Sequence, residues 1–333
     1  RLDKNMSQQA NKVLLIGAGG IGSRHLQGLK KSNVPIEIEV VDPSSSSIEI
    51  AKERYGEIEI NENIKQINYY PNIEDASDNI DLSIVATTSE IRYPVVKELL
   101  KNKVVNNLVL EKVLFQTIDA YTEIENLLEY KNVKCWVNHP RRMYPFYIEL
   151  KKKLLNANRV SLNYHGGDWG LACNGLHHID LLAYLVDSQN VELNSVYLDQ
   201  EIYSSKRKEF KEVYGLLNGK INNHLFSLSS LNCSSPSLLS IVSDDFFVKI
   251  NENNEEIIIY DKVDNWLEKR KSRKIVYFQS ELTHIFLEDI LINVICDLVS
   301  YQDAVKLHVP FIQCLKDHFE NVSGVKMNSC PIT

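Results

Sequence analysis

The stretch KVLLIGAGGIG, residues 12–22, decides the fold that this sequence predicts. It begins with a short, continuous apolar run at residues 13–16, which is typical of a strand buried on both faces. Gly17, Gly19 and Gly22 follow as G-x-G-x-x-G, and the residues after them predict a helix. Strand, glycine-rich turn and helix in this order indicate the start of a dinucleotide-binding unit.

Each glycine has a physical reason at its position. Gly17 allows a tight turn, Gly19 lets the backbone approach a pyrophosphate, and Gly22 allows the helix to pack closely on the strand. We expect Gly20 and Ile21 to contribute as well, because free N–H groups at a helix N-terminus attract phosphate. Two other interpretations stay open: a glycine-rich turn that binds no ligand, and a methyltransferase that binds S-adenosylmethionine.

An acidic residue stands where a dinucleotide site needs one. Asp42 follows Gly22 by 20 residues, at the end of a second apolar run. Its carboxylate can accept hydrogen bonds from a ribose diol and would repel a 2′-phosphate, which favours NAD as the cofactor. Ser44 and Ser45 can still bind a phosphate, so NADP stays open.

Composition limits the classes of function. The 333 residues are enough for about two domains. A hydrophobic content of 44%, a charged content of 24% and a net charge of −7 are ordinary for a soluble globular protein. We find no basic tract and no apolar run long enough to span a bilayer, so we expect neither a nucleic-acid partner nor a membrane. Residues 1–11 are polar and do not resemble a signal peptide, and those before Met6 are left out of the fold prediction.

The cysteines point to a reducing compartment. Six of them are scattered along the chain, and none forms a C-x-x-C pair. Reduced thiols in a cytoplasmic protein are the simplest explanation. The spacing of histidine, cysteine and acidic residues fits no metal site that we recognise, so we expect no metal.

The order of predicted elements gives the fold class. Strand and helix signals alternate through residues 11–137, which predicts a doubly wound parallel Rossmann sheet. From residue 138 to 333 strands mostly follow one another without helices, and Asn218-Gly219 predicts a hairpin turn between two of them. The chain is therefore expected to be α/β in its first domain. A second, α+β domain with a mostly antiparallel sheet would bind the substrate and support oligomerisation.

Polar residues follow the predicted strands of the first domain, at the edge where α/β sheets bind ligands. Thr87 and Thr88 follow the fourth strand and are expected to line the nicotinamide ribose. Glu111-Lys112 follows the fifth strand, and residues 138–142 (NHPRR) follow the sixth. Further on, residues 175–180 (GLHHID) begin a predicted helix.

At four places in order, the chain resembles the glucose–fructose oxidoreductase/inositol dehydrogenase family of nicotinamide-dependent enzymes. Residues 17–25 resemble the family's cofactor loop, and Glu111-Lys112 matches the start of its Glu-Lys-Pro signature. Residues 138–142 are similar to its Asn-x-x-Arg segment, and residues 175–180 match its Gly-x-His-x-x-Asp motif. The ordered set is more specific than any one motif.

The resemblance has two departures. The proline after Glu-Lys is Val113 here, and the position where many members carry an aspartate is Cys173. The Lys–Asp–His triad of inositol dehydrogenase-like members is thus incomplete, which leaves the proton acceptor open between Lys112 and His177.

The resemblance implies roles for single residues. Lys112 and His177 are the candidates for proton transfer, and Asp180, one helical turn from His177, would fix the imidazole tautomer. Glu111 would orient Lys112 or contact the nicotinamide ribose. His178 points elsewhere on the helix and is expected to be structural. The candidate substrate-binding residues are Lys112, Asn138, Arg141, Trp169, Asn174 and His177.

The sequence therefore predicts a cytoplasmic NAD(P)-dependent oxidoreductase. Its expected substrate is a secondary hydroxyl or keto group of a sugar or nucleotide-linked sugar. The alternative is a sensor or regulator of the same fold that binds cofactor and sugar without turnover. A broad antiparallel sheet needs a cover on one face, and in the resembling family self-association supplies it, so a homodimer or homotetramer is expected.

Overall fold

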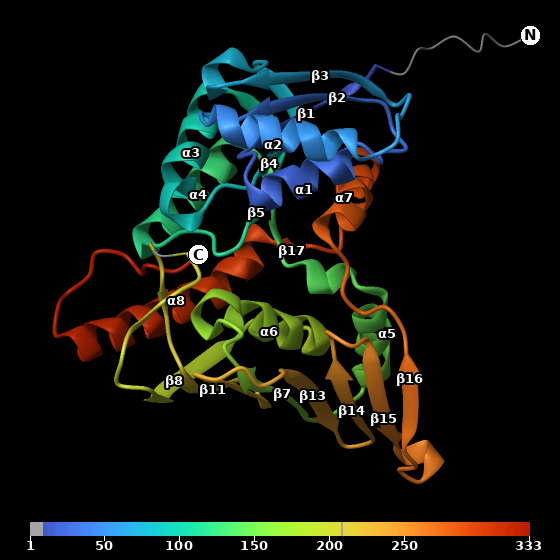
Figure 1. Ribbon diagram of the computed structural model, residues 1–333, viewed down its shortest axis with the longest axis vertical. Helices are drawn as coiled ribbons and strands as arrows, with labels where there is room; N and C mark the ends of the chain where they lie inside the picture. Colours follow the sequence, from blue (N-terminus) through green and yellow to red (C-terminus); the bar gives the residue numbers. More distant parts are fainter. Residues whose placement is uncertain (1–8, 208) are drawn as a thin grey trace, which may run out of the picture. The chain divides into compact units, whose positions relative to one another are not determined.

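The computed structural model describes residues 9–207 and 209–333, and the chain divides into two compact units (Figure 1). Residues 1–8, with the segment before Met6, lie outside the described residues. The first unit contains the chain up to Lys112, then Glu123–Asn138 and Phe278–Leu298. The second contains Val113–Thr122, His139–Tyr277 and Val299–Thr333.

The first unit is built on a parallel sheet. Its strands run in the order β6-β5-β4-β1-β2-β3, with parallel pairing between each neighbouring pair. The bounds are β1 Asn11–Ile16, β2 Ile36–Val41, β3 Ile64–Tyr70, β4 Asn79–Val85, β5 Val104–Glu111 and β6 Lys134–Asn138. The reversal of strand order beside β1 is the doubly wound arrangement predicted from the alternating strand and helix signals.

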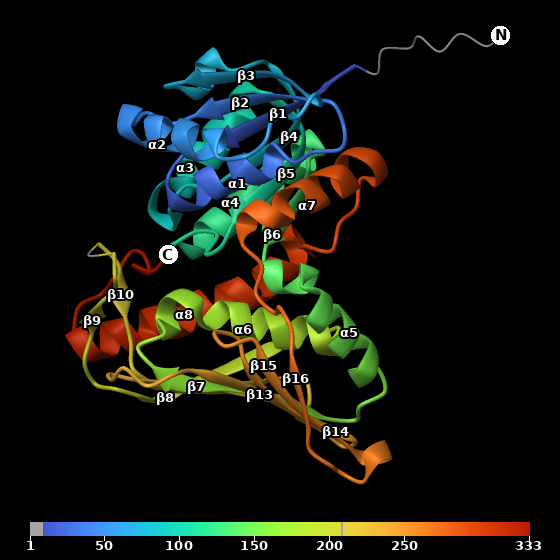
Figure 2. The same cartoon turned by 45° about the vertical axis from the view of Figure 1, so that its right-hand side comes forward.

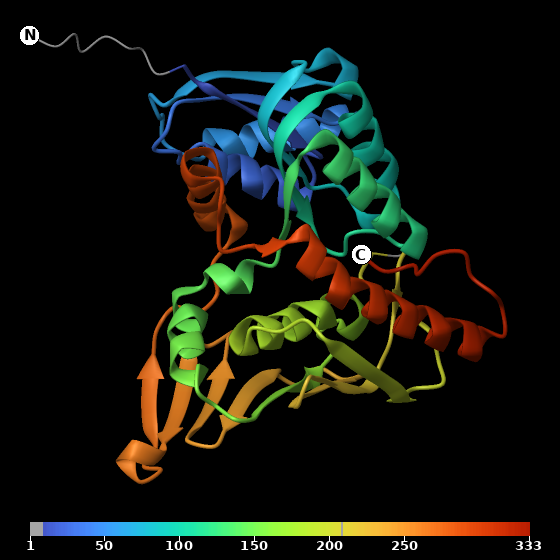
Figure 3. The ribbon, with the colours of Figure 1, turned by 180° about the vertical axis from the view of Figure 1, so that it is seen from behind.

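Helices cover both faces of this sheet. They are α1 Gly20–Leu29, α2 Ser45–Gly56, α3 Ser89–Asn102, the greater part of α4 Ile118–Lys131, and α7 Gln279–Asn293. Helix α1 lies between α2 and α7 on one face, and α3 lies on the other (Figures 2 and 3). The packing of α1 on α7 is close, because a Cβ at Gly28 would come within 2.6 Å of the Thr283 side chain. A helix from far along the chain thus completes the first unit, although the predicted domain boundary lies at residue 138.

The second unit is built on a larger sheet in the order β16-β15-β14-β13-β7-β12-β11-β8. Only β7 and β12 pair in parallel among these neighbours, so the sheet is mostly antiparallel, as predicted. The strand bounds are β7 Val160–Gly167, β8 Val191–Leu198, β11 Gly215–Ile221, β12 His224–Leu231, β13 Leu238–Ser243, β14 Phe246–Asn251, β15 Glu256–Asp261 and β16 Lys269–Ser272. Short strands occur at β9 Tyr203–Ser204, β10 Lys211–Glu212 and β17 Val299–Ser300.

Three helices gather on one face of the larger sheet (Figures 1 and 3). They are α5 Pro145–Leu154, α6 Leu171–Val186 and α8 Tyr301–Ser323. Helix α6 lies in the centre and contacts β7, β12, α5 and α8. Alternation along the strands places the core between these layers: Leu239 and Ile241 of β13 are fully buried, whereas Leu238 and Val242 are 37% and 38% exposed.

The hairpin turn predicted at Asn218-Gly219 is wrong. Strand β11 continues through both residues, and the turn to β12 lies at Asn222-Asn223, where Asn222 has a φ of 52°. Gly219 is needed for a different reason, since a Cβ there would lie 2.1 Å from the carbonyl oxygen of Glu192 on β8. Glycine inside a strand often marks a place where another backbone approaches closely.

Within the described part of the chain, no disulfide joins the cysteines and no helix is long and apolar enough to cross a membrane. The same residues contain no group of three or more histidine, cysteine and acidic side chains that could hold a metal ion.

Candidate functional site

The glycine-rich turn has an open cradle. Gly17 adopts a left-handed φ of 92°, and its N–H donates to the Val41 carbonyl at 2.8 Å. A Cβ at Gly22 would lie 1.8 Å from the carbonyl oxygen of Gly17, which explains the close packing of α1 on the turn. At Gly19 and Gly20 a Cβ would meet nothing within 4 Å. The turn is therefore tight on its protein side and open where a pyrophosphate would approach α1.

Asp42 fastens the end of β2 to this turn. Its Oδ2 accepts the N–H of Ala18 at 2.7 Å, and its Oδ1 accepts the N–H of Ser44 at 2.8 Å. Ser44 in turn begins α2, because its hydroxyl accepts the N–H of Ser47 at 3.2 Å. Each carboxylate oxygen retains a lone pair, so the half-buried Asp42 can also accept a ribose hydroxyl.

The segment after β4 lies beside the glycine turn. A Cβ at Gly17 would come within 3.0 Å of the Thr87 backbone nitrogen, and Thr88 occupies the N-cap position of α3. Arg92 is 1% exposed and donates to the Thr87 carbonyl. The two threonines thus reach the same sheet edge as the glycines.

A buried polar network lies at the end of β5. Glu111 Oε1 receives hydrogen bonds from the Asn138 amide at 2.6 Å and from His25 Nε2 at 2.8 Å. The Asn138 amide also donates to Gln279 at 2.8 Å, and His25 Nδ1 lies 2.9 Å from the Thr283 hydroxyl. Three motif segments of the sequence, the cofactor loop with its histidine, Glu111 and Asn138, therefore meet within the first unit.

The charge state of Glu111 follows from its partners. Burial on its own would raise the pKa of this carboxyl, but hydrogen bonds from His25 and Asn138 and the nearby charge of Arg92 outweigh burial and lower it. Glu111 is therefore a carboxylate held in a fixed orientation. Lys112 follows it directly after β5 and is half-buried.

Sequence reasoning missed α7 as part of this network. Gln279 and Thr283 carry no motif, and Gln279 lies 141 positions from its partner Asn138. The only signal was the histidine that ends the cofactor-loop resemblance, His25.

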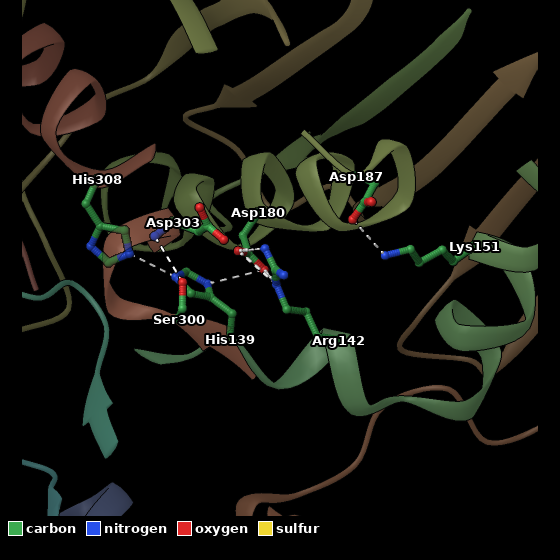
Figure 4. A network of polar contacts seen from close by, with 8 residues as sticks. All are labelled: His139, Arg142, Lys151, Asp180, Asp187, Ser300, Asp303 and His308. Atoms are coloured by element: carbon green, nitrogen blue, oxygen red, sulfur yellow. Dashed lines mark hydrogen bonds and ion pairs between the residues drawn. The ribbon is translucent and has the colours of Figure 1, made fainter. Parts of the chain in front are cut away.

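The second unit holds the other predicted residues. Asp180 of α6 is fully buried and accepts hydrogen bonds from the Arg142 guanidinium at 2.9 and 2.8 Å (Figure 4). Its Oδ2 also lies 3.9 Å from Nδ1 of His139. His177, one turn before Asp180, is partly exposed, and its ring meets that of His139 edge to face at 5.4 Å. The predicted function of Asp180 as the tautomer partner of His177 stays a prediction.

Arg141 forms a second ion pair, whose side chains are 16% and 10% exposed. It donates to Glu252 at 2.8 Å, and Tyr147 donates to the other oxygen of the same carboxylate at 2.6 Å. Although burial would raise the pKa of Glu252, the charge of Arg141 lowers it. The guanidinium of Arg141 is therefore held by a carboxylate of the protein. Its predicted contact with substrate stays a prediction. No motif in the sequence points to Glu252.

His178 is structural, as its place on the helix predicts. Its ring stacks on Tyr164 of β7 at 3.8 Å, and burial, followed by the charge of Arg141, lowers its pKa to about 3. The Trp169 ring lies 5.5 Å from the His178 ring, and its indole N–H donates to the Ser229 carbonyl at 2.7 Å.

The position of Cys173 has a carboxylate beside it. Glu212 of β10 is 4% exposed and accepts hydrogen bonds from the Ala172 and Val213 N–H groups. Burial raises the pKa of this carboxyl, and it outweighs these two hydrogen bonds and those from Cys173, which lower the pKa. Asn174, predicted to contact substrate, donates its amide to the Trp169 carbonyl at 2.9 Å. No motif in the sequence points to Glu212.

The first unit is similar to a known protein family. Residues 11–139 match the model of the GFO_IDH_MocA family, described as an oxidoreductase family with an NAD-binding Rossmann fold. A comparison with curated protein sequences finds no significant match.

Solved structures share the fold of both units. The chain is similar to UDP-N-acetylglucosamine 3-dehydrogenase GnnA from Acidithiobacillus ferrooxidans, at 13% identity and a TM-score of 0.69 over 92% of this chain and 97% of that one. It is similar to myo-inositol 2-dehydrogenase from Lactobacillus plantarum, at 16% identity and a TM-score of 0.67 over 94% and 98%. It is also similar to a super-repressor mutant of Gal80p from Saccharomyces cerevisiae, at 15% identity and a TM-score of 0.71 over 96% and 100%. Residues 11–139 thus carry the NAD-binding Rossmann domain of the GFO_IDH_MocA oxidoreductase family.

Proposed function

We propose that the protein is an NAD(P)-dependent oxidoreductase. It would transfer a hydride between nicotinamide and a secondary hydroxyl or keto carbon of a sugar or nucleotide-linked sugar. The observation that carries the proposal is the cradle of Gly19 and Gly20, open to at least 4 Å and fastened to Asp42 through the Ala18 N–H. A Cβ would fill that space, and the cradle lies at a helix N-terminus, where a pyrophosphate binds best.

The cofactor would be held by residues of the first unit alone. The glycine turn would bind the pyrophosphate, Asp42 the adenosine ribose, and Thr87 and Thr88 the nicotinamide ribose. Asp42 favours NAD because its carboxylate would face a 2′-phosphate of like charge. Fluorescence titration with NADH and NADPH tests this preference, and tighter binding of NADPH would overturn it.

The chemistry needs one proton acceptor besides the cofactor. A nicotinamide held at the glycine turn would supply a hydride acceptor for an alcohol substrate, and the hydroxyl proton would then need a nearby base. Lys112 and His177 are the proposed acceptors, and a positioned base of this kind contributes about 10²–10⁴-fold to the rate. Glu111, an oriented carboxylate directly before Lys112, would set the position of that lysine.

The Lys112→Ala variant tests this assignment. We expect turnover to fall by about 10²-fold or more, because the Lys112 amine would accept the proton of the substrate hydroxyl. NADH should still bind, because the proposed role of Lys112 includes no contact with the cofactor phosphates. Lys101→Ala, which removes an exposed lysine of the same unit, is the control and should keep normal turnover. A Lys112→Ala enzyme with near-normal kcat on the correct sugar would show that the assigned role is wrong.

A second candidate function is a sensor that binds cofactor and sugar without turnover. The similarity to Gal80p, of which a mutant is described as a super-repressor, favours it. Absorbance at the nicotinamide band across a panel of sugars and nucleotide sugars separates the two. Binding of cofactor together with a sugar, without any change in that band, would favour the sensor.

We further propose that the protein forms a homodimer or homotetramer through the face of the larger sheet opposite α6. That face carries apolar side chains at Leu225, Leu231, Leu238 and Val242, which are 38%, 60%, 37% and 38% exposed. Burying them in a partner would remove apolar surface from water. Light scattering at the mass of one 38.2 kDa chain would refute self-association.

A further inference from the structure

Two buried histidines outside the predicted set of residues contact each other in the second unit. His308 of α8 is fully buried, and its Nε2 lies 2.9 Å from Nε2 of His139 (Figure 4). On its other side, Nδ1 of His308 accepts the backbone N–H of Leu114 at 3.3 Å. His139 itself is 1% exposed, and its Nδ1 lies 3.9 Å from the Asp180 carboxylate.

These contacts determine where the ring protons lie. A backbone N–H can only donate, so Nδ1 of His308 carries a lone pair and its proton is on Nε2. That proton points at Nε2 of His139, which must therefore be the acceptor. The proton of His139 is then on Nδ1, on the side of Asp180. These contacts are all satisfied only when both rings are neutral and each is in a single tautomer.

His308 thereby joins three segments that carry proposed functional residues. Leu114 comes two residues after Lys112, His139 begins the segment after Asn138, and Asp180 lies one turn from His177. The His139 ring also packs edge to face on the His177 ring at 5.4 Å.

We propose that His308 is a positioning residue, which fixes the tautomer and orientation of His139 and through it the setting of Asp180 and His177. This role rests on the oxidoreductase function proposed above. His308 acts through other residues and transfers no proton to substrate.

The surroundings support a neutral pair. The rings of His177 and of Tyr121 in α4 face the pair, the latter 6.3 Å from the His308 ring. Arg142 neutralises Asp180 with two hydrogen bonds, so little net negative charge is left to stabilise an imidazolium. A proton added to Nδ1 of His308 would face the N–H of Leu114, and one added to Nε2 of His139 would face the N–H of His308. Protonation would therefore cost a hydrogen bond wherever it occurred.

Two substitutions separate the contacts of His308. In His308→Asn the amide oxygen takes the position of Nδ1 and can still accept from Leu114, but the donor to His139 is lost. In His308→Gln the amide nitrogen takes the position of Nε2 and can still donate to His139, but the acceptor for Leu114 is lost. Because the contact with His139 is the one that leads to Asp180 and His177, the glutamine variant is the conservative replacement.

The test combines imidazole ¹⁵N NMR with kinetics. In the unaltered protein we expect the spectra to show an Nε2–H tautomer for His308 and an Nδ1–H tautomer for His139, unchanged between pH 8 and 5.5. His308→Asn should release the tautomer of His139 and lower kcat by about 10- to 100-fold, the effect of slight misplacement of a reacting group. NADH affinity should stay unchanged, and His308→Gln should restore the tautomer and most of kcat. Circular dichroism checks the fold of both variants.

The outcomes are distinct. Mixed tautomers in the unaltered protein, or rings that titrate near pH 6.5, would overturn the proposal whatever the activity. Fixed tautomers with the same kcat in all three proteins would overturn the positioning role and leave the oxidoreductase proposal intact. If the unaltered protein turned over no sugar while binding cofactor, the oxidoreductase proposal would fail first, and the positioning role in that reaction would fail with it.

Discussion

Removal of the Asp180 carboxylate is expected to destabilise the second unit strongly. Asp180 is fully buried, and the Arg142 side chain that binds it is 10% exposed. Leucine at position 180 would leave the guanidinium buried without its counter-charge, which costs about 3–5 kcal/mol. Replacing both partners with apolar residues, as Arg142→Met with Asp180→Leu, should recover most of that loss, because no charge then remains in the core.

Helix α6 supplies a matched control. At its end Asp187 pairs with Lys151 at 3.3 Å, but the Asp187 side chain is 84% exposed (Figure 4). Asp187 also has a left-handed φ of 53°, which asparagine tolerates. Asp187→Asn should therefore cost about 0–1 kcal/mol, the range for pairs in water.

Urea unfolding followed by tryptophan fluorescence measures the difference. Trp136 belongs to the first unit, so a Trp136→Phe background leaves Trp169 and Trp266 as reporters of the second. With a slope of about 2 kcal/mol per molar urea, a loss of 3 kcal/mol lowers the midpoint by about 1.5 M. The reasoning is refuted if Asp180→Leu shifts the midpoint no more than Asp187→Asn, or if the double variant is as unstable as the single one.

Three further predictions concern other parts of the chain. Gly19→Ala should leave stability unchanged, since a Cβ there meets nothing within 4 Å. It should weaken NADH binding at least about tenfold in a fluorescence titration. Gly56→Ala in α2 is the control, because a Cβ there is equally unobstructed, and it should bind NADH normally. Burial lowers the pKa of His178 from 6.5 to about 3, so the unfolded chain binds the proton more readily than the folded protein does. The free energy of unfolding should therefore fall by about 1.4 kcal/mol for each unit that the pH drops below 6.5. In urea titrations from pH 7 to 4, His178→Phe should flatten this slope. Gly219→Ala should destabilise the second unit by about 1–3 kcal/mol by calorimetry, because its Cβ would lie 2.1 Å from the Glu192 carbonyl; an unchanged melting temperature would contradict this.

Local patterns were enough to predict the first sheet and its cofactor turn. Apolar runs, glycine spacing and an acid at a fixed distance all depend on residues close in sequence, and the structure has β1, the turn and α1 where they predict them. The Asn218-Gly219 prediction failed for the opposite reason. There the glycine is required by the close approach of the neighbouring strand β8, and the local sequence does not identify β8 as the partner.

The candidate site was predictable only in part. Its motif residues were found because they follow strand ends, but their partners come from distant segments without a pattern of their own. Glu252, Gln279 and His308 lie 111, 141 and 169 positions from the residues they bind. Such pairings arise from the tertiary fold, so the hydrophobic periodicity and the motif spacing of the sequence do not predict them.

The docking of α7 on α1 also bears on how the molecule is made. The ribosome must translate all of residues 30–278, which separate α1 from α7, before the helix that packs on this side of the first unit is synthesised. Until then the α1 surface around Gly28 has no covering helix and stays open to solvent and to chaperones. Folding of the first unit is thus coupled to the synthesis of α7, and a nascent chain released before that helix is made would expose the surface that α7 covers.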